Sequence, residues 1–315
     1  DEWQSIGMKE LSNNGNWVAY QVNAQEGDNT LNFFGLKTDK NLNFHRGEQS
    51  VFTSDSKFAI FKIRPFYKDL KLVRIKKKKE NEIAKDSIGI LNLATNKVEK
   101  LPNIKSFKTP QKGGSLLAYL LEKEEVKKDK SDSTKSKDKS AKPAKSSGKD
   151  KKDVPLELVL RNLTSGQKKS FKNVVNYDFS ENGKQLIYST KQEKKDSLDK
   201  NKYGVFLVNT ATFAQKQLVD TIGDFKQFTF DELANKVAFV GTTDDEKKEN
   251  KSYYLYYSSV PAQKEIQKSE LVGLKKDWFV SENRQPKFSK DGKSLFIGIA
   301  PKLEEKDTTL IAEDH

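Results

Sequence analysis

Apolar and polar residues alternate along most of this chain in short runs, which is the period of half-buried β-strands. The clearest case is residues 176–191, NYDFSENGKQLIYSTK, where two alternating runs flank the turn at 181–184. Gly183 in that turn tolerates the positive φ that tight hairpin connections often require. The pattern predicts an antiparallel β-hairpin.

The same hairpin unit recurs from one end of the sequence to the other. Related runs occupy residues 10–22, 50–63, 109–122, 227–241 and 285–299. The turn positions equivalent to Gly183 are Gly15, Ser56, Gly114, Asn235 and Gly292, and successive positions are separated by 41 to 69 residues. Such an interval accommodates one four-stranded sheet and is somewhat longer than the common propeller blade period.

A second hairpin type alternates with the first. It reads DSIGILNLATNKVEKL at 86–101 and returns at 156–171 and 203–219. Two hairpins per unit give four strands, and helical signals are weak throughout. We therefore predict an all-β chain, a β-propeller of four-stranded antiparallel blades with about five complete blades and part of a sixth. A β-sandwich is the alternative, but it does not explain why one turn motif returns six times.

Residues 122–153 differ in composition from the rest of the chain. They hold 12 Lys and 8 acidic residues, and no large apolar residue lies between Val126 and Val154. Such a segment cannot offset the entropy of ordering, so we predict a disordered insertion within the third unit. Smaller polar excursions at 192–202 and 242–251 occupy the same place in the next two units.

The composition limits the function classes. The chain of 315 residues contains no cysteine, which excludes disulfides and thiolate chemistry, and no run approaches the 18 apolar residues of a membrane span. Because the sequence begins at Asp1, we expect a processed N-terminus from which any signal peptide is already gone.

The net charge of +13 is concentrated in two segments. Residues 74–79 (RIKKKK) contribute five positive charges and residues 122–153 a net four, so the remaining surface is only mildly basic. The run 74–79 is a solvated face or a contact for an acidic partner, such as an anionic membrane surface or another domain. Nucleic acid is the least favoured partner, because no aromatic residue is interleaved with these cations.

Candidate catalytic chemistry is sparse. The sequence has no G-x-S-x-G elbow, and its only histidines are His45, in a strand-like run, and His315, the last residue. Without cysteine and with two distant histidines, a zinc site is not expected. We predict no catalytic residue, no metal site and no cofactor in this chain.

The repeat itself carries a family resemblance. The run FSKDGKSLF at 288–296, with relatives at Phe179 and Leu11, resembles the repeat of TolB-like propellers and of the propellers of prolyl oligopeptidase/dipeptidyl peptidase (S9) serine peptidases. The block from Arg46 to Leu93 resembles more specifically the N-terminal propeller of a bacterial S9-type group. The resemblance covers essentially the whole chain.

This resemblance implies a two-part protein. Such peptidases join a propeller of seven or eight blades to an α/β-hydrolase domain that holds a Ser–His–Asp triad. Residues 1–315 would then be a propeller incomplete at its C-terminal end, the hydrolase domain and its triad would lie beyond residue 315, and the chain alone would be inactive. The resemblance also implies a bacterial periplasmic, secreted or cell-envelope location.

Four residues are the candidate substrate contacts. Arg64 and Tyr67 follow a predicted blade strand, where loops can reach toward a substrate chamber. Glu304 and Glu305 follow the last predicted strand, and in dipeptidyl peptidases a glutamate pair of the propeller grips the substrate amino terminus. The pairs at 124–125 and 244–245 are weaker candidates, because both lie in polar loops.

Two function hypotheses follow. The chain is the gating propeller of an S9-like serine peptidase, which admits peptides to a buried triad and excludes folded proteins. Alternatively, it is a non-catalytic propeller scaffold that binds a protein partner in a cell-envelope assembly.

Overall fold

The computed structural model describes residues 3–76, 84–122, 154–192, 202–245, 248, 250–259, 267–269, 273–275 and 277–301. Within these ranges the chain forms five four-stranded antiparallel blades and part of a sixth, as the sequence predicts. Blade 1 comprises β1 (Gln4–Leu11), β2 (Trp17–Ala24), β3 (Thr30–Gly35) and β4 (Lys40–His45). Blade 2 comprises β5 (Gly47–Phe52), β6 (Phe58–Ile63), β7 (Ser87–Asn92) and β8 (Val98–Leu101).

The next two blades share one long strand. Blade 3 comprises β9 (Ile104–Lys108), β10 (Leu116–Leu121), β11 (Leu156–Asn162) and the first half of β12 (Lys168–Phe179). Blade 4 comprises the second half of β12, then β13 (Gln185–Thr190), β14 (Gly204–Asn209) and β15 (Gln215–Val219). β12 pairs with β11 up to Val174 and with β13 from there on, so the fourth strand of one blade runs directly into the first strand of the next.

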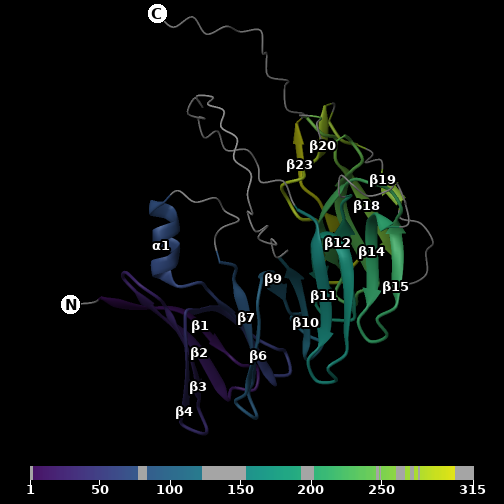
Figure 1. The fold of residues 1–315 in the computed structure, drawn as a ribbon. Helices are drawn as coiled ribbons and strands as arrows, with labels where there is room; N and C mark the ends of the chain where they lie inside the picture. The colour runs from purple at the N-terminus through teal and green to yellow at the C-terminus, as the bar shows by residue number, and fades with distance from the viewer. Residues whose placement is uncertain are drawn as a thin grey trace, which may run out of the picture.

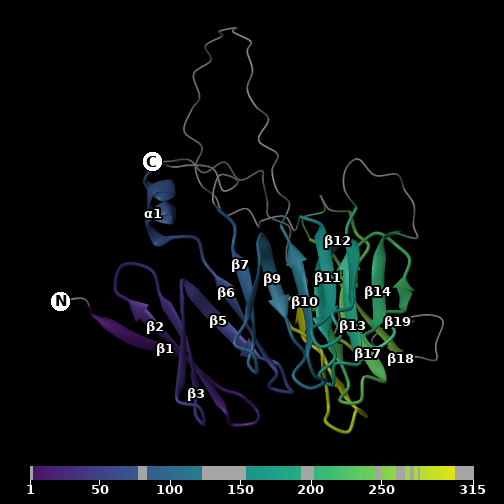
Figure 2. The same cartoon turned by 60° about the horizontal axis from the view of Figure 1, so that its bottom comes forward.

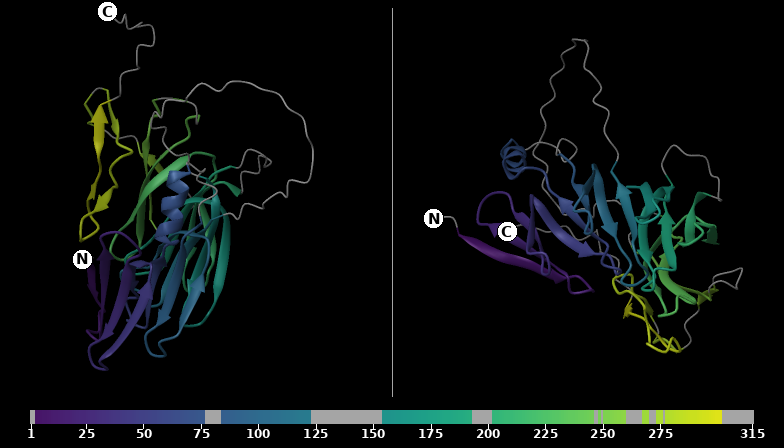
Figure 3. Two further views of the ribbon diagram at one scale, coloured as in Figure 1. Left: turned by 60° about the vertical axis from the view of Figure 1, so that its left-hand side comes forward. Right: turned by 90° about the horizontal axis from the view of Figure 1, so that it is seen from below.

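Blade 5 comprises β16 (Asp224–Phe230), β17 (Lys236–Thr242), β18 (Tyr254–Ser259) and β19 (Gln267–Ser269). The sixth unit is formed by β20 (Trp278–Val280) paired with β23 (Ile299–Pro301), and by β21 (Lys287–Phe288) paired with β22 (Leu295–Phe296). The blades follow one another in chain order around an open arc, as the view from below in Figure 3 shows. This arrangement is that of a propeller and excludes the two packed layers of a sandwich.

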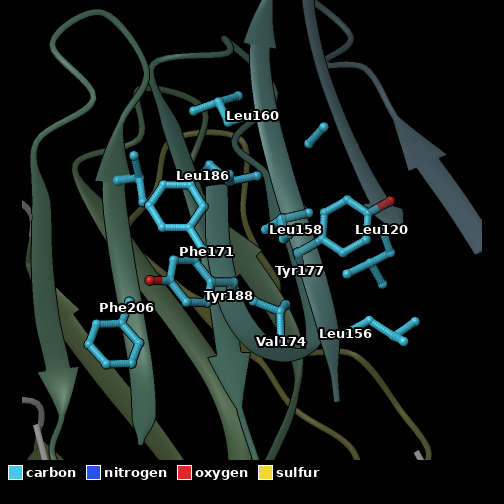
Figure 4. Close-up of a cluster of buried hydrophobic side chains, with 12 residues drawn as sticks. Leu120, Leu156, Leu158, Leu160, Phe171, Val174, Tyr177, Leu186, Tyr188 and Phe206 are labelled. Carbon is cyan, nitrogen blue, oxygen red and sulfur yellow. The ribbon is translucent and has the colours of Figure 1, made fainter. Parts of the chain in front are cut away.

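Each pair of neighbouring blades encloses its own hydrophobic cluster. Between blades 3 and 4 lie Leu158, Val174 and Leu186, all with no exposed surface, together with the rings of Phe171, Tyr188 and Phe206 (Figure 4). The ring centroids of Phe171 and Tyr188 are 4.9 Å apart, and those of Tyr188 and Phe206 are 5.2 Å apart. Similar clusters separate the other neighbouring blades, so the core of the molecule is divided among the blade interfaces.

The recurring turn has one geometry in blades 1, 2, 4, 5 and 6. Its first residue is Ser12, Thr53, Ser180, Asp231 or Ser289, whose side-chain oxygen accepts the N–H of the residue five positions later over 2.7 to 3.1 Å. Its fourth residue lies in the left-handed region, with φ between 55° and 69°. In blade 5 this residue is Ala234 and not the predicted Asn235, because the turn begins at Asp231.

These turns bond to one another across the blades. The Asn13 amide donates to the Ser54 carbonyl (2.9 Å), and the Ser115 hydroxyl donates to the Asp55 carboxylate (2.6 Å). The Lys112 N–H donates to the Glu181 carbonyl (2.7 Å). The two remaining blade junctions are bridged by Asn182 to the Glu232 carbonyl (3.3 Å) and by Lys236 to the Gly292 carbonyl (2.7 Å). We call this end of the blades the turn face.

The opposite end carries the connections between second and third strands, and we call it the loop face. Figures 1 and 2 show α1 (Tyr67–Ile75) there, between β6 and β7. The predicted insertion joins β10 to β11 at the same place, and apart from Glu122 it lies outside the described residues. The excursions at 192–202 and 242–251 likewise join second to third strands, as expected from the sequence.

The helix α1 departs from the prediction of weak helical signals. Phe66 at its N-cap position offers no side-chain acceptor, so the sequence lacks a local start signal. The acceptor comes from blade 1, where Asp28 Oδ1 receives the Tyr67 N–H over 2.8 Å. Glu26 in the same loop pairs with Lys71 in the middle of the helix. The helix is therefore held by a neighbouring blade, and the basic run at 74–79 begins in its last turn.

Candidate functional site

Arg64 lies at the loop face, directly after β6, within a cluster of charges from β5, β6 and the residue that precedes β7. Its guanidinium Nη1 is 3.0 Å from Asp86, and its Nε is 3.4 Å from Glu48. Lys62 is also 3.4 Å from Asp86. Because the Arg64 side chain is still 42% exposed, it is both fixed by two carboxylates and open to solvent.

Tyr67 is the first residue of α1 and points toward blade 1. Its hydroxyl donates to Glu26 over 3.4 Å. Arg64 and Tyr67 therefore lie on the same stretch of chain but engage different neighbours. Glu304 and Glu305 lie outside the described residues, as do Glu124 and Glu125.

A cleft of about 270 Å³ opens beside Arg64, and we call it the blade 2 cleft. It is lined by four cations, Arg46, Arg64, Lys85 and Lys100, by Asp69 of α1, and by apolar atoms that include the ring of Phe66. Lys85 pairs with Glu122 over 3.0 Å. Among the described residues no carboxylate pairs with Arg46 or Lys100.

Arg46 was not singled out from the sequence, although its side chain makes two specific contacts in this cleft. Its guanidinium carbon lies 3.9 Å from the centroid of the Phe66 ring, and its Nη1 donates to the Arg64 carbonyl over 2.8 Å. An arginine stacked on a ring and tied to a carbonyl keeps the rest of its donor fork available in one orientation.

A second cleft of about 430 Å³ lies between the first strands of blades 2, 3 and 4. It is lined by Gln49 and Lys62 of blade 2, by Lys105 and Lys108 of blade 3, and by Asp178 of blade 4. Lys108 and Asp178 form an ion pair at 3.0 Å. Arg64 lines the first cleft and Lys62 lines the second, and both side chains pair with Asp86. Blade 2 therefore presents cations to both clefts.

Polar side chains also tie first strands to one another elsewhere. Glu10 of β1 accepts the Phe52 N–H of β5 over 3.3 Å, and Asn176 donates to the Phe225 carbonyl over 3.2 Å. Burial raises the pKa of the Glu10 carboxyl, although hydrogen bonds from Phe52 and Ser50 act in the opposite direction. These contacts connect the first strands of neighbouring blades.

The remaining candidates have local structural roles. Asp244 accepts from Lys248 and from the Ser252 N–H, which lowers the pKa of its carboxyl and closes the β17–β18 connection. His45 is exposed on β4, with its Nδ1 3.4 Å from the Thr30 hydroxyl. In the part of the chain that the structure describes, no group of His, Cys, Asp and Glu could hold a metal ion.

None of the described helical residues forms a segment long and apolar enough to cross a membrane. Of the basic run, Arg74 to Lys76 end the helix, and 77–79 lie outside the described residues.

Comparison with known proteins gives similarities of structure only. No family model matches the chain, and no curated protein sequence matches it. The chain is similar to the β-propeller domain of the Trilobed protease from Pyrococcus furiosus, with 13% identity, 95% of this chain and 84% of that one covered, and a TM-score of 0.44. It is also similar to acylaminoacyl peptidase from Pyrococcus horikoshii, with 12% identity, 89% of this chain and 41% of that one covered, and a TM-score of 0.43.

A third similar structure is a TolB protein from Agrobacterium tumefaciens, with 9% identity, 82% and 78% coverage, and a TM-score of 0.35. The chain thus spans less than half the length of the acylaminoacyl peptidase it matches. The fold assignment rests on the sheets of this chain itself, and activity does not follow from fold.

Proposed function

We propose that this chain is the substrate-gating propeller of an S9-like serine peptidase, which hydrolyses peptides with a triad on a separate α/β-hydrolase domain. The proposal is supported by the sequence resemblance of Arg46–Leu93 to the propellers of such peptidases. In the structure this block holds β5, β6, α1 and β7, and it supplies Arg64 and all lining residues of the blade 2 cleft except Lys100 and Pro102.

The observation that carries the proposal is the difference between the two ends of the blades. On the turn face, short turns hydrogen-bond to the turns of the next blade, which makes that end a continuous rim. The loop face instead gathers the longer second-to-third-strand connections, the helix and a largely basic cleft. One braced end and one end rich in loops and charges suit a scaffold that selects what reaches a site beside it.

The experiment uses the intact protein, which is this propeller joined to the proposed hydrolase domain. It is labelled with a fluorophosphonate probe, which reacts with an activated serine nucleophile. We expect labelling that heat denaturation abolishes, together with hydrolysis of short unstructured peptides. An intact protein that neither labels nor cleaves any peptide in a random library would refute the proposal, and the scaffold hypothesis would then remain.

A further inference from the structure

The backbone of Arg46 is in a conformation that arginine rarely adopts. Its φ is 63°, in the left-handed region, where the Cβ of residues other than Asn and Asp is sterically disfavoured. The position repeats in the next two blades. The Arg46 carbonyl accepts the Arg64 N–H, just as the Asn103 carbonyl accepts the Glu122 N–H and the Asn173 carbonyl accepts the Lys191 N–H.

At both equivalent positions the chain uses asparagine, with φ of 57° at Asn103 and 60° at Asn173. Asparagine adopts this conformation at little cost because its short amide bonds locally. Of these three equivalent positions, only the one in blade 2 holds a residue other than asparagine, and that residue lines a cleft. Strain of this kind often marks a functional side chain.

The charge balance of the cleft indicates what such a side chain would meet. Lys62, Arg64 and Lys85 are compensated by Asp86, Glu48 and Glu122, while Arg46 and Lys100 have no carboxylate partner among the described residues. Asp69 also lines the cleft and offsets one of these two charges. Among the described residues of the cleft about one positive charge therefore remains, which suits a monoanion better than a doubly charged phosphate.

The walls are partly apolar, because the ring of Phe66, 48% exposed, and Ile63 contribute to them. A volume of about 270 Å³ accommodates a side chain or a chain end and no folded domain. We propose that the blade 2 cleft binds a carboxylate of a peptide, with Arg46 and Lys100 as its cationic contacts. The peptide as ligand class rests on the proposed function, whereas the carboxylate follows from the cleft.

The test is fluorescence anisotropy with rhodamine-labelled hexapeptides, on intact protein treated beforehand with the fluorophosphonate probe so that no peptide is cleaved. The peptides form a matched set: one internal glutamate or glutamine, each with a free or an amidated C-terminus. We expect the peptide with a carboxylate to bind about five to tenfold more tightly than its neutral counterpart, and the preference to weaken with added salt. The peptide set also shows whether the glutamate side chain or the free C-terminus causes the tighter binding, which identifies the source of the carboxylate.

Variants connect the preference to the cleft. Arg46→Asn and Lys100→Gln should each remove it, whereas Lys97→Gln, which removes the same charge at the other end of the β7–β8 hairpin, should keep it. Since asparagine suits the backbone, Arg46→Asn should unfold in urea near the wild-type midpoint. If Arg46→Asn fails to fold, Lys100→Gln against Lys97→Gln decides the matter alone.

Three results would overturn the inference: no difference between charged and neutral peptides, equal losses in Lys97→Gln and Lys100→Gln, or tighter competition by a sulfated oligosaccharide than by the acidic peptide. Serine labelling with no carboxylate preference overturns this inference and leaves the proposed function standing. Absence of both labelling and peptide binding overturns both.

Discussion

Replacing Asp55 by alanine tests whether the turn face holds the blades together. The Asp55 carboxylate accepts from the Thr53 hydroxyl (2.7 Å) and the Lys57 N–H (3.3 Å) within its own turn. It also accepts from the Ser115 hydroxyl of blade 3 over 2.6 Å. Asp291 has the same two local donors, Ser289 and Lys293, and among the described residues it makes no hydrogen bond to another blade, so Asp291→Ala is a matched control.

The expected magnitude follows from these bonds. Hydrogen bonds to charged groups contribute about 1.5–3 kcal/mol each, and the lower end applies here because the Asp55 side chain is 25% exposed. We expect Asp55→Ala to lower the free energy of unfolding by about 2–4 kcal/mol, and Asp291→Ala to lower it by clearly less, because the Asp291 carboxylate is exposed to solvent. The difference belongs to the bond between blades 2 and 3.

Urea unfolding followed by tryptophan fluorescence measures both variants, and a double-mutant cycle with Ser115→Ala isolates the pair. A coupling energy of about 1.5 kcal/mol or more is expected. Two results would refute the idea that the turn face holds the blades together. One is a loss of unfolding free energy that differs by less than about 0.5 kcal/mol between Asp55→Ala and Asp291→Ala, and the other is a double-mutant cycle in which the effects of Asp55→Ala and Ser115→Ala simply add.

The pH dependence gives an independent reading of the same residue. Burial acts to raise the pKa of the Asp55 carboxyl, but the hydrogen bonds from Ser115 and Thr53 outweigh it, so the pKa is lowered in the folded state. The stabilisation is therefore complete above the unfolded pKa of about 4 and is lost as pH falls through the folded pKa. In Asp55→Ala the free energy of unfolding should therefore fall less steeply as the pH is lowered.

Four further changes test other parts of the account. Gly183 has φ 69°, and a Cβ at this position would lie 2.8 Å from the Lys112 carbonyl oxygen, whereas a Cβ at Gly15 would meet open space. Gly183→Ala should therefore lower the free energy of unfolding in urea by clearly more than the roughly 1–2 kcal/mol expected for Gly15→Ala. Equal losses would mean that the turns of blades 3 and 4 do not touch. Leu158→Ala should cost about 2–5 kcal/mol because Leu158 is fully buried between blades 3 and 4, and a loss below about 1 kcal/mol in the same assay would contradict that packing. Asp28→Ala should speed hydrogen exchange at the start of α1 without moving the global urea midpoint, and unchanged exchange would show that the helix does not need this cap. Glu10→Gln should stabilise the protein at pH 7 and not below pH 4, because a carboxyl whose pKa is raised in the folded state opposes folding only when it is ionised. An equal effect of the substitution at pH 7 and below pH 4 would argue against the burial of Glu10.

The blade architecture was predictable because it depends on short-range signals. The alternation of apolar and polar residues predicted the strands. The recurring turn residues Gly15, Ser56, Gly183 and Gly292 adopt the positive φ that their position in the turn suggested. The blade 5 turn was misplaced by one residue, since Ala234 gives no chemical sign of a left-handed conformation and only the capping Asp231 fixes the register.

Features that depend on contacts between blades could not be predicted. The start of α1 is capped by Asp28, a residue 39 positions earlier in the chain, so no local pattern announced the helix. The role of Arg46 becomes visible only when it is compared with Asn103 and Asn173 as equivalent blade positions. An alignment of the repeats at the position of Arg46, Asn103 and Asn173, in addition to the glycine turns, would have placed Arg46 in the left-handed region from sequence alone.

The gating function is tested most directly by presenting one cleavable peptide sequence in two settings to the intact, fluorophosphonate-reactive protein. In the first it is a free peptide of about ten residues, and in the second the same sequence lies in a surface loop of a stable folded carrier. We predict that the free peptide is cleaved and the carrier is not, until denaturation of the carrier makes its loop accessible as an extended chain. Equal rates of cleavage for the free peptide and the folded carrier would contradict a gating propeller.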